Sequence, residues 1–368
     1  MILDAYSSAP LPDMLDEQKQ NLMYFFLNPS SSNMMSMRSK EILVRSRRSV
    51  AQFLGCSDSE VIFTSSSTES NNLAIKGVLF NSLLNTRKGN IVTTDWEHIS
   101  IHHPIKSMQR LFGFGVVYIK TDSRGEFDVE DLRNVINEDT LLFTIGAVCR
   151  ETATIRDVAS IVRKVKSINP NVICHVDLWG LYYPTDYIPI GEIDIATLDG
   201  PFLLAPQGIS ALYVKKGVRL RPLIEGGIQE RGIRAGEGNL FGIFSLGYSL
   251  KFLTDNKNAI VLSLKEADNL LTEYIHLPAL YNPNRKALGL FSYGIKTDAE
   301  MFVSLLEKHG FLLGTSSPCM LNDVKKITKV KIGDFQDILF IRIPPLTPLS
   351  YLKDLAEKIK VISEGSKL

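Results

Sequence analysis

Short apolar runs alternate with helical segments from about residue 40 to about residue 215, and this alternation constrains the fold more than any other feature. Several of the runs are almost continuously apolar, as strands are when helices cover both faces of a parallel sheet. The predicted strands lie at 60–65, 90–94, 115–121, 140–148, 171–177 and 194–198. Segments such as 157–168 supply the crossover helices. The pattern predicts an α/β fold with a mostly parallel sheet, whose ligands gather at the carboxyl ends of the strands.

The residues after about 250 have a different texture. A strand, a helix, a second strand and a closing helix follow one another, which is typical of a small α+β unit. Thr297 and Glu300 predict a capping box at the start of the first of these helices. We therefore expect a large, cofactor-type domain over 16–250 and a small α+β domain formed by 1–15 and 251–368.

The charge of the chain is almost balanced, with 41 basic and 40 acidic residues in 368. Such a balance creates no long-range field for nucleic acid or acidic membranes, so neither is an expected partner. The first residues do not read as a secretory signal, and no run is long and apolar enough to cross a bilayer. The four cysteines have no metal-binding spacing and no disulfide framework is evident. These features predict a cytoplasmic protein.

Six phrases carry a resemblance to a known family. They are "NPSSSN" (28–33), "FTSSSTESNNLAIKG" (63–77), "IVTTDWEHISI" (91–101), "HVD" (175–177), "GGIQERGIRAGEGN" (226–239) and "SSPC" (316–319). In this order they resemble the cysteine desulfurases of the NifS/IscS type, which are pyridoxal-phosphate (PLP) enzymes of the aminotransferase class V. The similarity covers nearly the whole chain and implies the fold of the PLP-dependent transferases, fold type I.

The resemblance implies roles for five residues. His98 matches the histidine that stacks on the PLP ring, and Asp177 matches the carboxylate that bonds the pyridinium nitrogen. Thr68 is placed for the phosphate at a helix N-terminus, Arg342 for the substrate carboxylate, and Cys319 for the sulfur-accepting thiol. Each has a plainer interpretation: a packed histidine, a helix cap for Thr68 and an inert buried cysteine.

Other positions depart from the family. Phe202 stands where the lysine forms the Schiff base with PLP, and Gly180 replaces a glutamine that bonds the ring hydroxyl. Asp199 replaces a phosphate-binding serine, and Glu237 replaces a hydroxyl residue that reaches the phosphate of the neighbouring subunit. Arg150, with Cys149 before it, takes the place of two asparagines.

These departures predict weak PLP binding. One pair of unit charges about 4 Å apart interacts by roughly 4 kcal/mol at an effective dielectric constant near 20. A phosphate facing both Asp199 and Glu237 would be repelled by terms of that size, so the expectation is that the chain takes no cofactor. An iron–sulfur cluster contact through Cys319 stays open.

Two functions compete on these grounds. In one, the chain has lost PLP-dependent desulfuration and binds an iron–sulfur scaffold or a sulfur acceptor, or carries a persulfide on Cys319, with Cys149 as a second thiol. The alternative is an active cysteine desulfurase that converts cysteine to alanine and an enzyme persulfide. A homodimer is expected in both, and where the cofactor site is empty Arg150 is expected to approach Asp199 or Glu237 across it.

Overall fold

The computed structural model describes residues 2–4, 7, 11–85, 88–315, 331–332 and 335–365. Its main feature is a seven-stranded sheet in the order β2-β10-β9-β8-β5-β3-β4. The strands are β2 (Val61–Thr64), β3 (Asn90–Thr94), β4 (Gly115–Ile119), β5 (Thr140–Gly146), β8 (Ile173–Asp177), β9 (Ile195–Leu198) and β10 (Ser210–Val214). All neighbours pair in parallel except β10, which is antiparallel to both β2 and β9. The predicted α/β fold with a mostly parallel sheet is confirmed.

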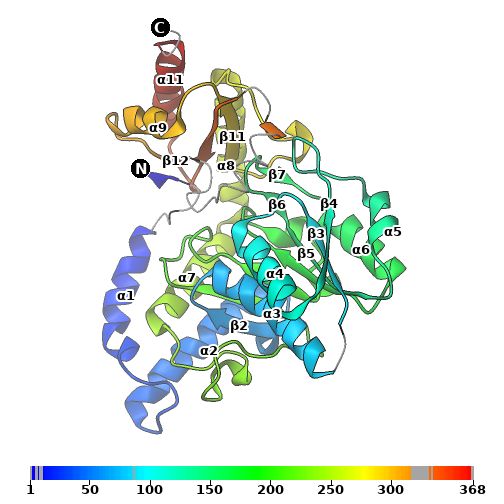
Figure 1. Cartoon of the computed structure of the whole chain (residues 1–368). Helices are drawn as coiled ribbons and strands as arrows, with labels where there is room; N and C mark the ends of the chain where they lie inside the picture. Colours follow the sequence, from blue (N-terminus) through cyan, green and yellow to red (C-terminus); the bar gives the residue numbers. More distant parts are fainter. Residues whose placement is uncertain are drawn as a thin grey trace.

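The central strands are buried over their whole length, which explains why they read as apolar runs. Helices α3 (Ser67–Leu84) and α4 (Ile99–Phe112) lie side by side in front of this sheet in Figure 1, and α6 (Val158–Ile168) lies beyond them at the right. A short ribbon of β6 (Val148–Cys149) and β7 (Thr154–Ile155) follows β5. The carboxyl ends of β3, β5, β8 and β9 therefore meet at one edge.

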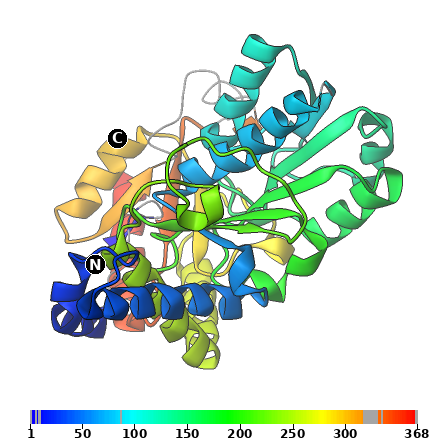
Figure 2. The same cartoon turned by 90° about the horizontal axis from the view of Figure 1, so that it is seen from below.

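Helices from both halves of the sequence flank the sheet on its other side (Figures 1 and 2). They are α2 (Met34–Leu54) and α7 (Leu240–Asp255), and α1 (Pro12–Phe25) packs on α7. Helix α8 (Lys257–Tyr274) lies beside the second sheet in Figure 1. A glycine lets α2 and α7 approach closely, because a Cβ at Gly247 would lie 2.8 Å from the backbone of Ser46.

A second sheet has the order β1-β12-β13-β11 and packs against α9 (Ala299–Glu307) and α11 (Leu349–Gly365). Its strands are β1 (Ile2–Leu3), β11 (Leu290–Ile295), β12 (Leu312–Thr315) and β13 (Asp337–Arg342). The predicted capping box is wrong: Asp298 caps α9, and its Oδ1 accepts a hydrogen bond from the Met301 amide at 2.9 Å. The division into two domains at residue 250 stays a prediction.

Among the described residues, no helix has the length and apolar character that a membrane crossing requires.

Candidate functional site

Asp177 is the centre of a buried polar chain at the carboxyl end of β8. Its Oδ2 accepts hydrogen bonds from Asn71 Nδ2 at 3.0 Å and from Arg150 Nη2 at 3.1 Å, and its Oδ1 accepts one from the Trp179 amide at 3.1 Å. The Arg150 and Asp177 side chains are only 7% and 2% exposed. A buried carboxylate needs such partners, because an isolated charge is strongly disfavoured away from water.

The ion pair with Asp177 gives Arg150 a partner within one chain that the sequence did not predict, and its approach to Glu237 of a neighbouring subunit stays a prediction. The guanidinium was expected at Asp199 or Glu237, but within one chain it bonds Asp177 and lies 4.5 Å from the ring centroid of Trp179. A planar cation on an aromatic face is favourable, and more so when both are buried. Sequence reasoning placed Arg150 by the family positions around the phosphate, and the nearest buried carboxylate decided its actual partner.

His98 begins α4 and joins the same chain of contacts. Its Nδ1 accepts from the Ser100 amide at 3.3 Å and lies 2.8 Å from Ser100 Oγ, which in turn accepts from Asn71 Nδ2 at 2.8 Å. Burial, with the Arg150 guanidinium and His102 adding to it, holds the pKa of His98 well below its ordinary value of 6.5. The histidine is therefore neutral at pH 7, and the fold brings it together with Asp177 as the sequence predicts.

Phe202, which the resemblance places where the family has its lysine, lies in the core. The side chain is 1% exposed and packs between Tyr182, with ring centroids 4.8 Å apart, and Trp179, with centroids 5.6 Å apart. The Arg342 guanidinium covers the ring at 4.6 Å. The turn that carries Phe202 is held by Asp199, whose Oδ1 accepts from the Phe202 amide at 2.9 Å. The position is thus part of an aromatic core.

Arg342, which the sequence assigns to a substrate carboxylate, donates to the protein instead. Its Nε bonds Tyr182 Oη at 3.0 Å, its Nη1 the Ser7 carbonyl at 2.6 Å and its Nη2 the Phe202 carbonyl at 2.5 Å. The side chain is 1% exposed. These contacts use three of the five N–H groups of the guanidinium, so its role toward a substrate carboxylate stays a prediction.

Asp199 brings a carboxylate to the N-terminal turn of α3. Its Oδ2 accepts from Ser67 Oγ at 2.6 Å, while Ser66 caps the helix through the Glu69 amide at 3.1 Å. Helix N-termini attract anions, so this carboxylate lies where the family resemblance places the phosphate. Thr68 is exposed in the first turn, and its carbonyl accepts from Asn72.

Glu237 and Gly180 complete the departures from the family. Glu237 is exposed and lines a separate cavity of about 210 Å³, so its approach to a neighbouring subunit stays a prediction. Gly180 has a φ of +90°, and a Cβ there would lie 3.0 Å from the side chain of Val148. The glutamine of the family does not fit this backbone without a shift.

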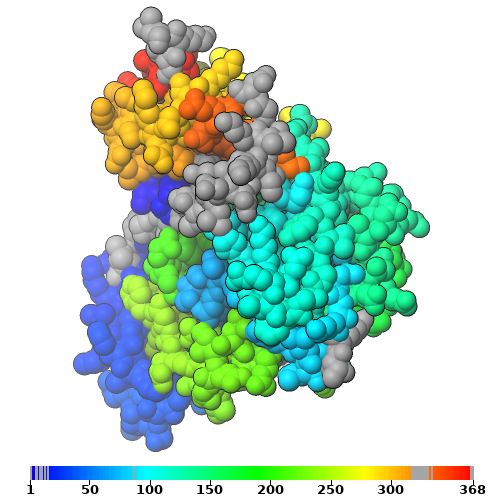
Figure 3. Space-filling model, in the orientation of Figure 1, coloured from blue at the N-terminus to red at the C-terminus, as the bar shows by residue number. Residues whose placement is uncertain are grey.

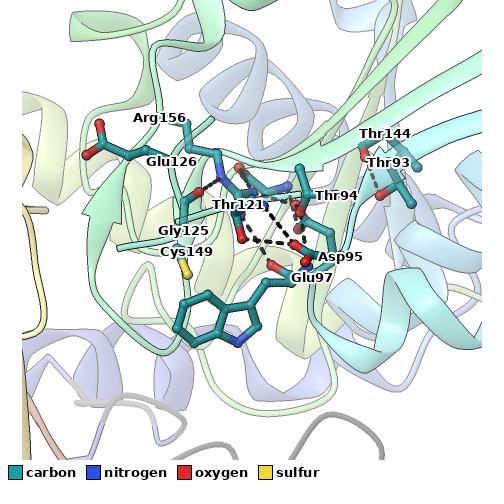
Figure 4. A network of polar contacts seen from close by, with 12 residues as sticks. Thr93, Thr94, Asp95, Glu97, Thr121, Gly125, Glu126, Thr144, Cys149 and Arg156 are labelled. Carbon is teal, nitrogen blue, oxygen red and sulfur yellow. Dashed lines mark hydrogen bonds and ion pairs between the residues drawn. The ribbon is translucent and has the colours of Figure 1, made fainter. Parts of the chain in front are cut away.

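A buried ion pair that no sequence motif marks lies beneath the site. Arg156 Nη1 lies 2.5 Å from Glu97 Oε1, and both side chains are at most 3% exposed (Figure 4). Arg156 also donates to the carbonyls of Gly125, Gly146 and Trp96 at 2.8, 3.0 and 3.2 Å. The only signal was a pair of charged residues beside apolar strands, in "WEH" and "TIRD".

Cys319 lies outside the described residues. Of the other thiols, burial raises the pKa of Cys149 and of Cys174 to about 12, with Glu151 and Asp194 adding to the respective rises. The thiolate is the reactive form, so a persulfide role for Cys149 is not supported.

The buried carboxyl group of Glu151 makes the stability of the folded chain depend on pH. Burial raises the pKa of its carboxyl from 4.5 to about 7, and Glu97 adds to the rise. Between these values the folded chain binds more protons than the unfolded chain, so the contribution of Glu151 to stability is lost as the pH rises through this window.

We predict that Glu151→Gln gains stability relative to the parent by roughly 3 kcal/mol between pH 4.5 and pH 7 and no more above it. Urea unfolding at several pH values measures this difference, with Glu266→Gln, at an exposed position, as the control; a difference that does not change with pH contradicts the prediction.

This chain is similar in sequence and in structure to known proteins. The family model "Aminotransferase class-V" matches residues 1–320. The chain belongs to the aminotransferase class-V family. It is 33% identical over 307 residues to "Cysteine desulfurase 2" of Trichormus variabilis, covering 81% of this chain and 75% of the relative. It is 36% identical over 322 residues to a cysteine desulfurase of Nostoc sp., covering 84% and 77%. A solved structure named "NifS-like protein" superposes with a TM-score of 0.87 at 25% identity, covering 98% of each chain.

The class-V assignment confirms the resemblance to cysteine desulfurases and the fold of the PLP-dependent transferases, and the function is cysteine desulfurase-like. It also corrects one prediction. PLP is the cofactor of this family, so the comparisons contradict the expectation that the chain takes none. PLP is the cofactor to consider for this class-V protein.

The side chains of this class-V protein, as arranged here, do not fit PLP held by a Schiff base. Residue 202 has no amine, and the cavity between His98, Arg150, Asp177 and Trp179 measures about 10 Å³. A volume of that size accommodates roughly one water molecule. A PLP ring that is to bond Asp177 therefore requires the Arg150 side chain to move.

Proposed function

We propose that this cysteine desulfurase-like chain has lost desulfuration through residue 202 and serves as a homodimeric sulfur-handling protein, with Cys319 as its persulfide carrier. The burial of Phe202 under Arg342, between Tyr182 and Trp179, carries the proposal. An amine at this place is what the family uses to attach PLP, and a phenyl ring cannot form the bond.

Persulfide transfer needs no cofactor on the receiving chain. The Cys319 thiolate attacks the terminal sulfur of a persulfide donor, the S–S bond breaks, and the donor leaves as its thiolate. Among the described cysteines, burial raises the pKa of Cys56, Cys149 and Cys174 to about 12 in each case. This protection of the other thiols supports Cys319 as the carrier. The acceptor would be an iron–sulfur scaffold or another sulfur acceptor protein.

A second candidate is favoured by the comparisons. The relatives named above are called cysteine desulfurases, and the retained His98 and Asp177 match that activity. In this candidate the chain releases sulfur from cysteine with PLP present and without a covalent bond to residue 202.

One experiment separates the two candidates. The protein is incubated with cysteine and excess PLP, and sulfide and alanine are measured; in parallel, it receives sulfur from a persulfide donor and is mapped by mass spectrometry. We expect no alanine above the protein-free control, and a persulfide on Cys319 that Cys319→Ser abolishes and Cys174→Ser leaves in place. Catalytic turnover of cysteine to alanine supports the second candidate, and a Cys319 that never gains sulfur defeats the first.

The homodimer is supported by an exposed apolar surface, here called the methionine face. It comprises the last turn of α1, the connection to α2 and the first turn of α2, which lie at the lower left in Figures 1 and 3. Six of its side chains are each at least 50% exposed: Leu22, Met23, Phe26, Met34, Met35 and Met37. Exposed apolar surface is typical of protein–protein contacts, and methionine adapts well to a partner surface.

We predict that the double substitution Phe26→Glu/Met34→Glu converts the dimer into a monomer. Two buried carboxylates on each side of a self-complementary contact repel one another and lack partners. Light scattering at micromolar concentration measures the mass. Leu262→Glu, at a position on α8 that is 60% exposed, is the matched control and leaves the dimer intact. A monomeric parent, or a double variant that stays dimeric, contradicts the prediction.

A further inference from the structure

We infer that Arg150 is a displaceable internal occupant of the cofactor site, so that a ligand bonding Asp177 must compete with the guanidinium. The inference rests on the cysteine desulfurase-like site described above and adds a control on access to it. Arg150 donates to Asp177 Oδ2 at 3.1 Å. Arg150 thus acts on ligand access through its contact with Asp177.

The guanidinium shares the properties of a protonated pyridine ring. Both are flat and cationic, and both offer an N–H group to a carboxylate. Arg150 further stacks on Trp179 at 4.5 Å, as a flat aromatic cation would. Asp177 is thus satisfied without an external ligand, which removes the cost of leaving a buried carboxylate unpaired.

A ligand that competes with Arg150 can reach Asp177 through a neighbouring groove. His98 lines both the 10 Å³ space beside Arg150 and an open groove of about 890 Å³. Lys76, Lys106 and Arg110 line that groove, and no carboxylate is among its lining residues in the described part of the chain. A positive groove raises the local concentration of an anionic ligand, so the ligand class is a flat cation that carries a phosphate or carboxylate.

Family positions suggest how to open the site. Asparagine stands at this position in the family resemblance, and it is shorter and neutral. Arg150→Asn therefore frees Asp177 and the face of Trp179 while it leaves Asn71 and the Trp179 amide as hydrogen-bond donors.

The test measures PLP binding without turnover. Equilibrium dialysis of PLP and the quenching of tryptophan fluorescence give the dissociation constant for the parent, for Arg150→Asn and for Arg163→Asn, an exposed arginine changed in the same way. We expect Arg150→Asn to bind PLP about tenfold or more tightly than the parent and the Arg163→Asn control. Equal dissociation constants for all three overturn the inference.

A variant that folds poorly remains informative. If the unpaired Asp177 lowers the melting temperature of Arg150→Asn, PLP should raise that temperature more than it does for the parent, because the ligand binds only the folded state. Absence of this PLP-dependent rise overturns the inference as well. Neither readout involves sulfur transfer, so a failed persulfide experiment and a failed gate are distinguishable.

Discussion

Phe202→Lys is expected to destabilise the protein by about 4 kcal/mol or more and to yield no desulfurase. The substitution removes a ring that packs against Tyr182 and Trp179 and brings an amine under the Arg342 guanidinium, which lies 4.6 Å from the ring centroid. Two positive charges at that separation repel by roughly 3 to 4 kcal/mol at an effective dielectric constant near 20. Urea unfolding and a sulfide assay with cysteine and excess PLP measure the two outcomes.

Phe202→Leu is the matched control for this site. It keeps an apolar side chain and is expected to lose about 1 to 1.5 kcal/mol, so the difference between the two variants reports the polar group. A well-folded Phe202→Lys protein that attaches PLP and releases sulfide would contradict the prediction. It would show that the aromatic cluster accommodates a lysine and that only the amine was missing.

Arg156→Met is expected to cost about 3 to 5 kcal/mol, because it leaves the Glu97 carboxylate buried without its charged partner. Three carbonyl groups, of Gly125, Gly146 and Trp96, also lose a donor. These carbonyls lie at or just after the carboxyl ends of the strands, so the loss spreads to the segment that carries His98. Thermal or urea unfolding gives the difference.

The exposed pair of Arg163 and Glu192 offers a direct comparison. Its side chains are 62% and 39% exposed, and the same change, Arg163→Met, is expected to cost less than about 1 kcal/mol. A double-mutant cycle of Arg156→Met with Glu97→Gln should show coupling of about 1 to 3 kcal/mol. Equal losses of stability for Arg156→Met and Arg163→Met would contradict the prediction that the buried ion pair holds the loops in place.

Local helix signals were only partly sufficient. Thr297 was predicted to cap α9 because a glutamate follows three residues later, yet the carboxylate of Asp298 accepts the hydrogen bond from Met301. Either residue type can cap a helix, and the choice depends on where the preceding strand β11 ends. The helix itself was foreseen, since its apolar positions repeat at helical spacing.

The protein partners of buried charges are what local sequence patterns did not reveal. Arg150 was expected at Asp199 or Glu237, but it bonds Asp177, which lies 27 residues away in the sequence. Tyr182, Phe202 and Ser7 accept hydrogen bonds from Arg342 across separations of up to 335 residues, and its contact with a substrate stays a prediction. No local pattern encodes such pairs.

The sequence by itself determined the mostly parallel sheet and the membership of the class-V family, and it predicts that Phe202 stands where the family has its attaching lysine. Each depends on a feature that is local in the chain: the period of apolar residues, a motif, or one residue type. Only the tertiary structure decided that Arg150 forms an ion pair with Asp177 and that Arg156 forms one with Glu97 beneath the site. A buried charge needs an opposite charge nearby, and the packing of strands that are distant in the sequence determines which one lies within hydrogen-bonding distance.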